Sequence, residues 1–368
     1  MAVATSDNSQ PALFFSAGEA SGDAYVHELA SRLQFAKMHG VGNVKSQSAG
    51  VQLVANSGDW GALGILEALK IYPRVRKGFY SAKKFLASEK PGIFIPIDYG
   101  YMNVRLGKFA KASGWKVIYF IPPGSWRRNK QGSDLPTFTD AIITPFSWSA
   151  DLLNQAGANA HWFGHPLKQM VRELATESVH RSGIAILPGS RKHEIENNLP
   201  VIHQVVKNWD VPLRFGVAAN VEIPTLQMAW KSLGGREAQF SHETHAMLLQ
   251  SQAGIICSGT ATLESAICGC PCVVMYRGSK MMEIEYRIRK PKFDYISLPN
   301  ILLDRALLPE MIQWDATAEN LSKHLEPLLS DTPERQAQLA GFQEIDGILG
   351  PNNALDRSVE LIKEISQS

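Results

Sequence analysis

The stretch Ile184-Ala185-Ile186-Leu187-Pro188-Gly189-Ser190-Arg191 predicts a buried strand that runs into a tight turn. An amphipathic helical pattern follows it to about Lys207. Further apolar runs of strand length come later in this half of the chain, at Leu213–Val217, Ile255–Cys257 and Cys272–Met275. Buried strands that alternate with helices are typical of a parallel sheet with helices on both faces.

The first half of the chain has the same rhythm. Strands are expected at Ala12–Ser16, Ile93–Ile97, Val117–Ile121 and Ala141–Ile143. The sequence therefore predicts an α/β protein with two doubly wound, Rossmann-like domains that meet near Gly164-His165-Pro166-Leu167. Ligands are expected in a cleft at the carboxyl ends of the strands. After Trp314 the pattern is helical, and Pro333 and Pro351 are expected to start helices.

Composition and motifs exclude several classes of function. The 368 residues are enough for about two domains, and a net charge of +2 argues against a dedicated nucleic-acid binder. The turns lack both the Gly-x-Gly-x-x-Gly of nicotinamide dehydrogenases and the Gly-Lys-Ser/Thr of a P-loop. Because residues 1–10 do not resemble a signal peptide and no apolar run is long enough to span a bilayer, we expect a soluble cytoplasmic protein.

Cysteine and histidine spacing gives no sign of a metal site. The four cysteines, Cys257, Cys268, Cys270 and Cys272, lack the paired Cys-x-x-Cys spacing of zinc sites and are expected to be small buried hydrophobes. His165 is expected to be structural. The other candidates, His193, His242 and His245, show no metal-ligand spacing with a carboxylate partner. We expect no metal.

Two motifs of the first half carry candidate catalytic groups. In Gly18-Glu19-Ala20-Ser21-Gly22-Asp23, the glycines would let the backbone approach a ligand, Glu19 suits a sugar hydroxyl, and Asp23 suits a helix cap. Asp98 follows the strand Ile93–Ile97. A partly desolvated carboxylate at that position suits a general base, but a helix cap explains it equally well.

Two motifs of the second half suit a nucleotide diphosphate. Gly189-Ser190-Arg191 opens a helix, where backbone N–H groups bind anions and Arg191 adds a fork of donors. Ser258-Gly259-Thr260 repeats this device, and Glu264 lies one turn further on, where a carboxylate suits a ribose diol.

Six ordered motifs resemble the lipid-A-disaccharide synthase family. They are Ala17–Asp23, Ile97-Asp98, Gly164-His165-Pro166, Leu187–Arg191, Ser258–Glu264 and Tyr295-Ile296-Ser297-Leu298-Pro299-Asn300. The resemblance implies a metal-independent, inverting GT-B glycosyltransferase. It would join UDP-2,3-diacylglucosamine to 2,3-diacylglucosamine 1-phosphate, releasing UDP.

The resemblance also implies roles for single residues. Asp98 is the expected base, with Glu19 as a second catalytic residue beside the cleft loop of Gly18, Ser21 and Gly22. The expected donor-binding residues are Gly189, Ser190, Arg191, Gly259, Thr260, Glu264 and Asn300. Residues 1–167 would form the acceptor domain, completed by a helix within 350–368, and residues 168–349 would form the donor domain. A homodimer is left open.

The acceptor half departs from the family pattern. Gly42-Asn43-Val44-Lys45 replaces Gly-Gly-Pro-x-Met, Met102 replaces a second aspartate, and Trp126-Arg127-Arg128 replaces Trp-Ala-Trp. The donor class is therefore better supported than the acceptor. Two alternatives stay open, namely another GT-B UDP-sugar reaction (lipid-linked N-acetylglucosamine transfer or UDP-GlcNAc epimerisation) and a silent paralogue that binds UDP-sugar or lipid.

Residues 70–90 are rich in basic and aromatic side chains. This pattern suits the face of a helix that lies on anionic lipid, although a solvated surface helix explains it equally well. The candidate membrane and acceptor residues are Leu66, Leu69, Arg74, Arg76, Lys77 and Phe79. We therefore expect the protein to lie at the inner face of the cytoplasmic membrane, with no nucleic-acid partner.

Overall fold

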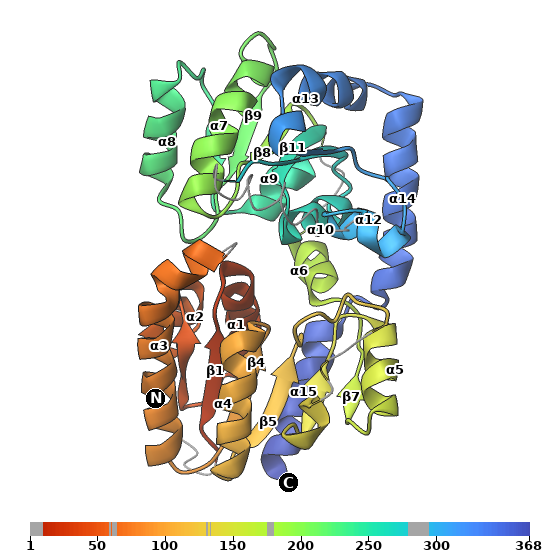
Figure 1. Ribbon diagram of the computed structural model, residues 1–368. Helices are drawn as coiled ribbons and strands as arrows, with labels where there is room; N and C mark the ends of the chain where they lie inside the picture. Colours follow the sequence, from red (N-terminus) through yellow and green to blue (C-terminus); the bar gives the residue numbers. More distant parts are fainter. Residues whose placement is uncertain are drawn as a thin grey trace, which may run out of the picture. The chain divides into compact units, whose positions relative to one another are not determined.

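The computed structural model describes residues 10–58, 60, 65–129, 132, 134–174, 180–278 and 294–368 (Figure 1). Of residues 65–68 and 70, only the backbone is described. The chain divides into two compact units, Met1–Gln169 with Leu349–Ser368 (unit 1) and Met170–Ile348 (unit 2). The boundaries expected from the sequence lie within two residues of these.

Unit 1 is built on a parallel sheet in the order β3-β2-β1-β4-β5-β6-β7. Its strands are β1 (Leu13–Ala17), β2 (Met38–Gly42), β3 (Gln52–Asn56), β4 (Ile93–Ile97), β5 (Lys116–Phe120), β6 (Ala141–Ile143) and β7 (Ala160–His161). Every residue of β1 and β4 is buried, because helices cover both faces of the sheet. Phe14 packs against Phe94 and Phe85 in this core.

The helices of unit 1 follow the strands as the sequence predicts. They are α1 (Ala20–Leu33), α2 (Val44–Ser48), α3 (Ile65–Ser88), α4 (Gly100–Ala112), the short 3₁₀ turn Leu135–Thr137, α5 (Ser147–Gln155), α6 (Pro166–Leu174, across the unit boundary) and α15 (Ala354–Gln367). The helix expected to start at Pro351 starts instead at Ala354.

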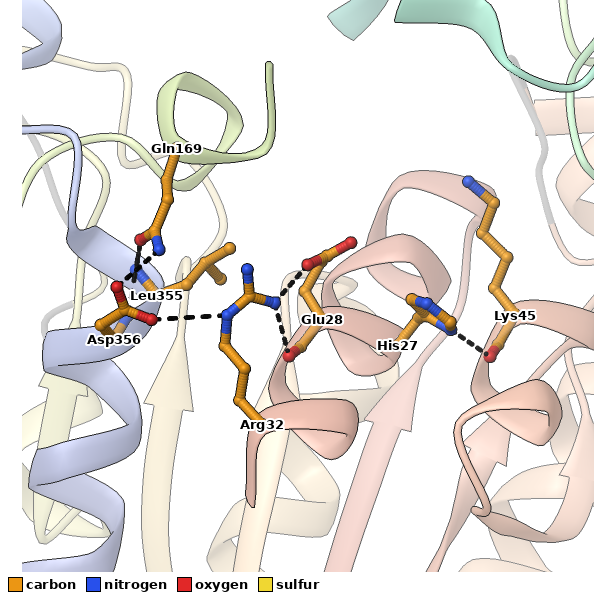
Figure 2. A network of polar contacts seen from close by, with 7 residues as sticks. All are labelled: His27, Glu28, Arg32, Lys45, Gln169, Leu355 and Asp356. Atoms are coloured by element: carbon orange, nitrogen blue, oxygen red, sulfur yellow. Dashed lines mark hydrogen bonds and ion pairs between the residues drawn. The ribbon is translucent and has the colours of Figure 1, made fainter. Parts of the chain in front are cut away.

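The last helix, α15, is part of unit 1, as expected. Asp356 lies 3.5 Å from the Arg32 guanidinium of α1 and accepts a hydrogen bond of 2.8 Å from the Gln169 amide (Figure 2). Gln169 Oε1 in turn accepts from the Leu355 N–H at 2.7 Å. At the other end of the helix, the Lys116 ammonium donates to the Ile365 carbonyl at 2.8 Å. These bonds join α15 to α1, α6 and β5.

Unit 2 is built on a second parallel sheet in the order β10-β9-β8-β11-β12-β13. Its strands are β8 (Ile184–Leu187), β9 (Leu213–Gly216), β10 (Gln239–Ser241), β11 (Ala253–Cys257), β12 (Cys272–Tyr276) and β13 (Glu310–Ile312). The helices are α7 (Lys192–Val206), α8 (Ile223–Ser232), α9 (Thr244–Gln250), α10 (Thr260–Ile267), α12 (Leu298–Leu303), α13 (Ala318–Leu325) and α14 (Pro333–Leu349), with 3₁₀ turns at Gln313–Asp315 and Glu326–Leu329. Phe215 lies between Trp230 and Phe240 in its core.

Candidate active site

Backbone strain is concentrated where β4 and β5 end. Asp98 and Tyr99 have φ values of 43° and 48°, and Ile121 has a φ of 52°. Residues with side chains rarely adopt this left-handed region, and β-branched residues such as isoleucine least of all. β4 and β5 are parallel neighbours, so these residues share one edge of the sheet. Strain of this kind persists only where the surroundings enforce it, and it is typical of functional sites.

Asn103 is the residue that enforces this backbone. Its side chain is fully buried on α4, and its amide nitrogen donates to the carbonyls of Ser16, Ile97 and Asp98 at 2.9–3.0 Å. Its amide oxygen accepts from the Ser16 hydroxyl at 2.6 Å. The Tyr119 hydroxyl also donates to the Asp98 carbonyl, at 2.9 Å. Asn103 thus ties the ends of β1 and β4 together.

Asp98 carries a carboxyl group with an unusual proton affinity. The side chain reaches solvent, yet crowding by protein and, second, repulsion from Glu19 raise the pKa of Asp98 from 3.8 to about 6. Burial and Glu19 also raise the pKa of Tyr99 to about 12. Glu19 itself is half-buried at the start of α1. Two carboxylates that repel each other, one of which has a pKa near neutral pH, suit general base chemistry.

The glycine loop owes its glycines to internal packing. A side chain at Gly18 would overlap the Tyr99 ring, and one at Gly22 would contact the Ala17 side chain at 3.1 Å. Our expectation that these glycines let a ligand approach is therefore corrected, since the space beside Gly18 is filled by Tyr99. Ser21 is half-buried in the first turn of α1.

Asp23 also has a different role from the one expected. It is buried, and its carboxylate accepts from the N–H groups of Asn43, Lys45 and Ser46 at 2.6–3.2 Å and from the Ser46 hydroxyl. Asp23 therefore satisfies the first N–H groups of α2 rather than those of its own helix.

Two of the three departures from the family pattern in unit 1 lie at buried positions. Met102 is buried in the core beneath α4, where a carboxylate would be unpaired. Asn43 is buried at the start of α2. At the third, the guanidinium of Arg128 lies 4.3 Å from the centre of the Trp148 ring, and that of Arg127 lies 5.2 Å from the Trp126 ring. Both arginines are exposed, so aromatic faces orient two cations just after β5.

α3 has a buried face and an exposed face. Val75, Ala82 and Leu86 pack into the core, whereas Leu69, Tyr72 and Tyr80 are 62%, 45% and 54% exposed. The cationic side chains of Arg74, Arg76, Lys77 and Lys84 are also exposed, and Arg76 lies over the Tyr80 ring.

One residue of the expected membrane surface lies elsewhere. Phe79 is a correction, because it is half-buried against the core. Lys83 lies over the Phe109 ring at 4.7 Å. The side chain of Leu66 lies outside the described residues. None of the helices that the structure describes combines the length and the hydrophobicity needed to span a bilayer.

In unit 2 the two predicted turns lie side by side, because β8 and β11 are neighbours. Buried Asn198 of α7 joins them, since its amide nitrogen donates to the Pro188 carbonyl at 2.8 Å and contacts the Cys257 sulfur at 3.4 Å. Its amide oxygen accepts from the Arg277 N–H at 3.1 Å, just beyond β12. Asn198 thus has the same role at this edge as Asn103 has in unit 1.

Glu194 occupies the first turn. Its carboxylate accepts from the Ser190 and Arg191 N–H groups at 3.0 and 3.2 Å and pairs with the Arg191 guanidinium at 2.7 Å. Gly189, with a φ of 125°, leaves room for this carboxylate. The prediction that these two N–H groups await a phosphate is therefore corrected, because they already have an anionic acceptor. The Ser190 hydroxyl and the Arg191 guanidinium remain the candidate donor groups there.

The second turn is open. Gly259 has a φ of 153°, and a Cβ placed on it would meet nothing within 4 Å. Gly259 and Thr260 are exposed at the start of α10, where the first N–H groups of a helix lack the usual intrahelical acceptor; the Thr262 N–H already donates to the Gly259 carbonyl at 3.2 Å. Glu264 lies one turn on, where its carboxylate Oε2 is 3.1 Å from Nε2 of His245. Residue spacing could not predict this carboxylate partner of His245, because the two residues come from different helices.

Asn300 differs from its expected role as a donor-binding residue. It is fully buried and donates to the Leu308 carbonyl and to Glu310 Oε1, both at 2.8 Å. Its amide oxygen accepts from the Leu307 and Leu308 N–H groups at 2.9 and 2.7 Å. This pattern uses both ends of the amide inside the protein, so Asn300 holds the loop before β13.

The cysteines and His165 are internal. All four cysteines are free and buried, and burial raises the pKa of each thiol. Burial lowers the pKa of His165 to about 3. The Nδ1 atom of its imidazole accepts a hydrogen bond of 3.3 Å from the Leu167 N–H. Among the described residues, no group of three or more His, Cys, Asp or Glu side chains could hold a metal ion.

Comparison with known proteins agrees with these two sheets and their motifs. A family model described as lipid-A-disaccharide synthetase matches residues 13–357. The chain belongs to this family. The lipid-A-disaccharide synthase of Acidobacterium capsulatum is 27% identical to it over 394 residues, covering 98% of each chain. Members of the lipid-A-disaccharide synthase family are glycosyltransferases, and this chain is accordingly an enzyme of that type.

Solved structures identify the fold of this lipid-A-disaccharide synthase family member as GT-B. The UDP-GlcNAc 2-epimerase of Methanocaldococcus jannaschii, in complex with UDP-GlcNAc and UDP, superposes with a TM-score of 0.57 at 10% identity, covering 96% of this chain and 99% of its own. The calicheamicin glycosyltransferase CalG4 superposes with a TM-score of 0.55 at 12% identity, covering 96% and 98%.

Proposed function

We propose that this enzyme transfers 2,3-diacylglucosamine from UDP to a hydroxyl of 2,3-diacylglucosamine 1-phosphate, with inversion at the anomeric carbon. The observation that carries the proposal is Asp98, a strained carboxylate with a pKa of about 6 at the carboxyl edge of the unit 1 sheet. The family relationship supports the substrates.

The chemistry needs one base and one stabilised leaving group. The Asp98 carboxylate takes the proton of the acceptor hydroxyl as its oxygen attacks the anomeric carbon. The bond from that carbon to the UDP oxygen breaks, and UDP leaves as an anion. In our proposal the Arg191 guanidinium and the first N–H groups of α10 stabilise the diphosphate without a metal ion, and Glu264 binds the ribose hydroxyls.

The direct test supplies both substrates and weighs the lipid product. We expect a tetra-acyl disaccharide phosphate and one UDP for each linkage formed. Conversion of UDP-GlcNAc to its 2-epimer with no lipid product would identify the epimerase alternative instead. Binding of UDP without turnover of either substrate would identify a silent paralogue.

Arg191→Ala is expected to weaken UDP binding by about 1.5–3 kcal/mol, the range for a hydrogen bond to a charged group. The UDP affinity of Arg191→Lys should lie between those of Arg191→Ala and the parent, because a lysine keeps the positive charge but loses the forked donors of the guanidinium group. Titration calorimetry with and without a chelator measures both the affinity and its independence of metal.

The matched control for this prediction is Lys192→Ala, which removes the neighbouring, highly exposed cation. It should leave UDP affinity unchanged. Unaltered binding in Arg191→Ala, or binding that requires magnesium, would contradict the proposed donor site. Since Glu194 is buried and paired with Arg191, thermal unfolding must show that the variant is folded at the temperature of the titration.

We also propose that the exposed face of α3 binds anionic lipid. Leu69, Tyr72 and Tyr80 supply apolar and aromatic groups that suit a lipid interface. Exposed cations lie along the same helix, at Arg74, Arg76, Lys77 and Lys84. This combination suits peripheral attachment at the cytoplasmic face of the membrane.

Replacement of these four cations by glutamine is expected to release the protein from anionic vesicles. Each surface cation contributes about 1 kcal/mol near anionic lipid, and salt screens this contribution. Co-sedimentation with vesicles at low and high salt measures the effect. UDP binding should be unchanged.

A triple variant of exposed lysines in unit 2, with Lys207, Lys231 and Lys323 changed to glutamine, controls for the loss of general positive charge. It should still bind the vesicles. If the α3 variant sediments like the parent, α3 is an ordinary solvated helix.

A further inference from the structure

One histidine in unit 2 is bonded to a residue of the proposed donor site. His245 is the second residue of α9, and Glu264 lies in the middle of α10. The imidazole Nε2 is 3.1 Å from Glu264 Oε2, and the two side chains are only 13% and 17% exposed. Because an ionised carboxylate can only accept a hydrogen bond, the Nε2 atom of His245 must carry the proton of this bond.

Two further contacts hold the backbone around His245. The Cys268 thiol, just beyond α10, faces the His245 carbonyl at 3.9 Å. Thr244, the preceding residue, packs against Gly216 at the end of β9, where a Cβ would lie 3.0 Å from its methyl group. The start of α9 is therefore fixed between β9 and α10, and the imidazole has a defined position relative to Glu264.

We propose that His245 is a positioning residue, which orients the Glu264 carboxylate for the ribose hydroxyls of the nucleotide. This inference rests on the proposed function of Glu264. A glutamate side chain has several rotatable bonds, and a ligand that must order it loses affinity. One hydrogen bond to His245 fixes the carboxylate before the nucleotide binds. An ionised carboxylate has about four lone-pair positions, so this bond leaves capacity for a ribose hydroxyl.

The experiment compares UDP with its 2′-deoxy and 3′-deoxy analogues by titration calorimetry. His245→Leu is expected to weaken UDP binding about tenfold, the lower end of the range for a hydrogen bond to a charged group. One analogue lacks the hydroxyl that Glu264 binds. Its affinity should be nearly the same for His245→Leu as for the parent, because its binding does not depend on the position of the carboxylate. His245→Gln, whose amide nitrogen can reach the place of Nε2, should restore most of the discrimination between UDP and that analogue.

Glu264→Gln separates this inference from the proposed function. If the ratio of the affinity for UDP to that for each analogue is the same in Glu264→Gln as in the parent, Glu264 does not bind the ribose, and the proposed role of Glu264 is wrong. If Glu264→Gln loses the discrimination and His245→Leu keeps it, only the positioning role is wrong.

A general structural role for His245 has a different signature. His245→Leu would then weaken UDP and the deoxy analogues by the same factor, and this result would overturn the inference. His203→Leu is the matched control, since it removes another half-buried histidine of unit 2, one that lies beside the Trp230 ring. It should change neither affinity.

Discussion

Asp98→Asn is expected to lower turnover by about 10²–10⁴-fold, the usual contribution of a general base. Asparagine has nearly the same shape, and it adopts positive φ more readily than most residues, so the turn after β4 should form unchanged. UDP affinity should stay the same, because the proposed donor residues lie in unit 2. Initial rates of UDP release, with calorimetry on the same preparation, measure both quantities.

The pH dependence gives this prediction a second, independent readout. Because the pKa of Asp98 is about 6, kcat/KM of the parent should fall as the pH drops below about 6. Repulsion from Glu19 is the second cause of the raised pKa, so Glu19→Gln should move this acid limb to lower pH. A shift in the other direction would contradict the assignment, whatever Glu19→Gln does to the rate itself.

The same raised pKa has a consequence for stability. Since the folded-state pKa lies above that of the unfolded chain, the folded state binds this proton more tightly, and ionised Asp98 destabilises the fold at neutral pH. Asp98→Asn should therefore be at least as stable as the parent at pH 7. The difference in stability should shrink as the pH falls through about 6 toward about 4.

The control is Asp151→Asn, which removes an exposed carboxylate on α5 and should change neither rate nor stability. A normal rate in Asp98→Asn would leave Asp98 as a turn residue and require another base.

The sequence predicted those strands that are continuous apolar runs, such as Ile93–Ile97 and Ile184–Leu187. It did not predict β2, Met38–Gly42, which contains a histidine and two glycines. A Cβ at Gly40 would lie 2.6 Å from the Phe15 carbonyl of β1, so a glycine is needed for strand pairing there. A contact between positions so far apart in the chain has no local signal, and local propensity favours a loop.

The candidate ligand-facing residues were predictable, but the residues that hold them were not. Asp98 and Gly259 stand directly after apolar strands, where doubly wound folds keep their sites. Asn103 and Asn198 each join a nearby turn to a segment tens of residues away. One signal could have found them, because each asparagine lies on the largely apolar, buried face of its helix. An amide at such a place requires hydrogen-bond partners inside the protein.

Asn300 shows how a motif can be correct while the role inferred from it is not. Its position in Ser297-Leu298-Pro299-Asn300 suggested a ligand contact, whereas the structure surrounds its amide with four internal partners. Glu310 also accepts from the Ile296 and Ser297 N–H groups, both at 2.9 Å. The segment Ile296–Asn300 and strand β13 are therefore joined through one asparagine and one glutamate.

Asn300→Ala is expected to lower the free energy of unfolding of unit 2 by about 3–5 kcal/mol, because each buried group left without a partner costs about 1–3 kcal/mol and such costs are not fully additive. Asn300→Asp keeps the acceptor for the Leu307 and Leu308 N–H groups but brings a second carboxylate against Glu310, so it should also destabilise. Denaturant unfolding measures the stability of both variants.

Asn320→Ala, which removes an exposed side-chain hydrogen bond to the Asp315 carbonyl, is the matched control and should change stability by less than about 0.5 kcal/mol. If Asn300→Ala unfolds like the parent but no longer binds UDP, the amide contacts the nucleotide directly; if it is destabilised and still binds UDP where it is folded, its role is to hold the loop before β13.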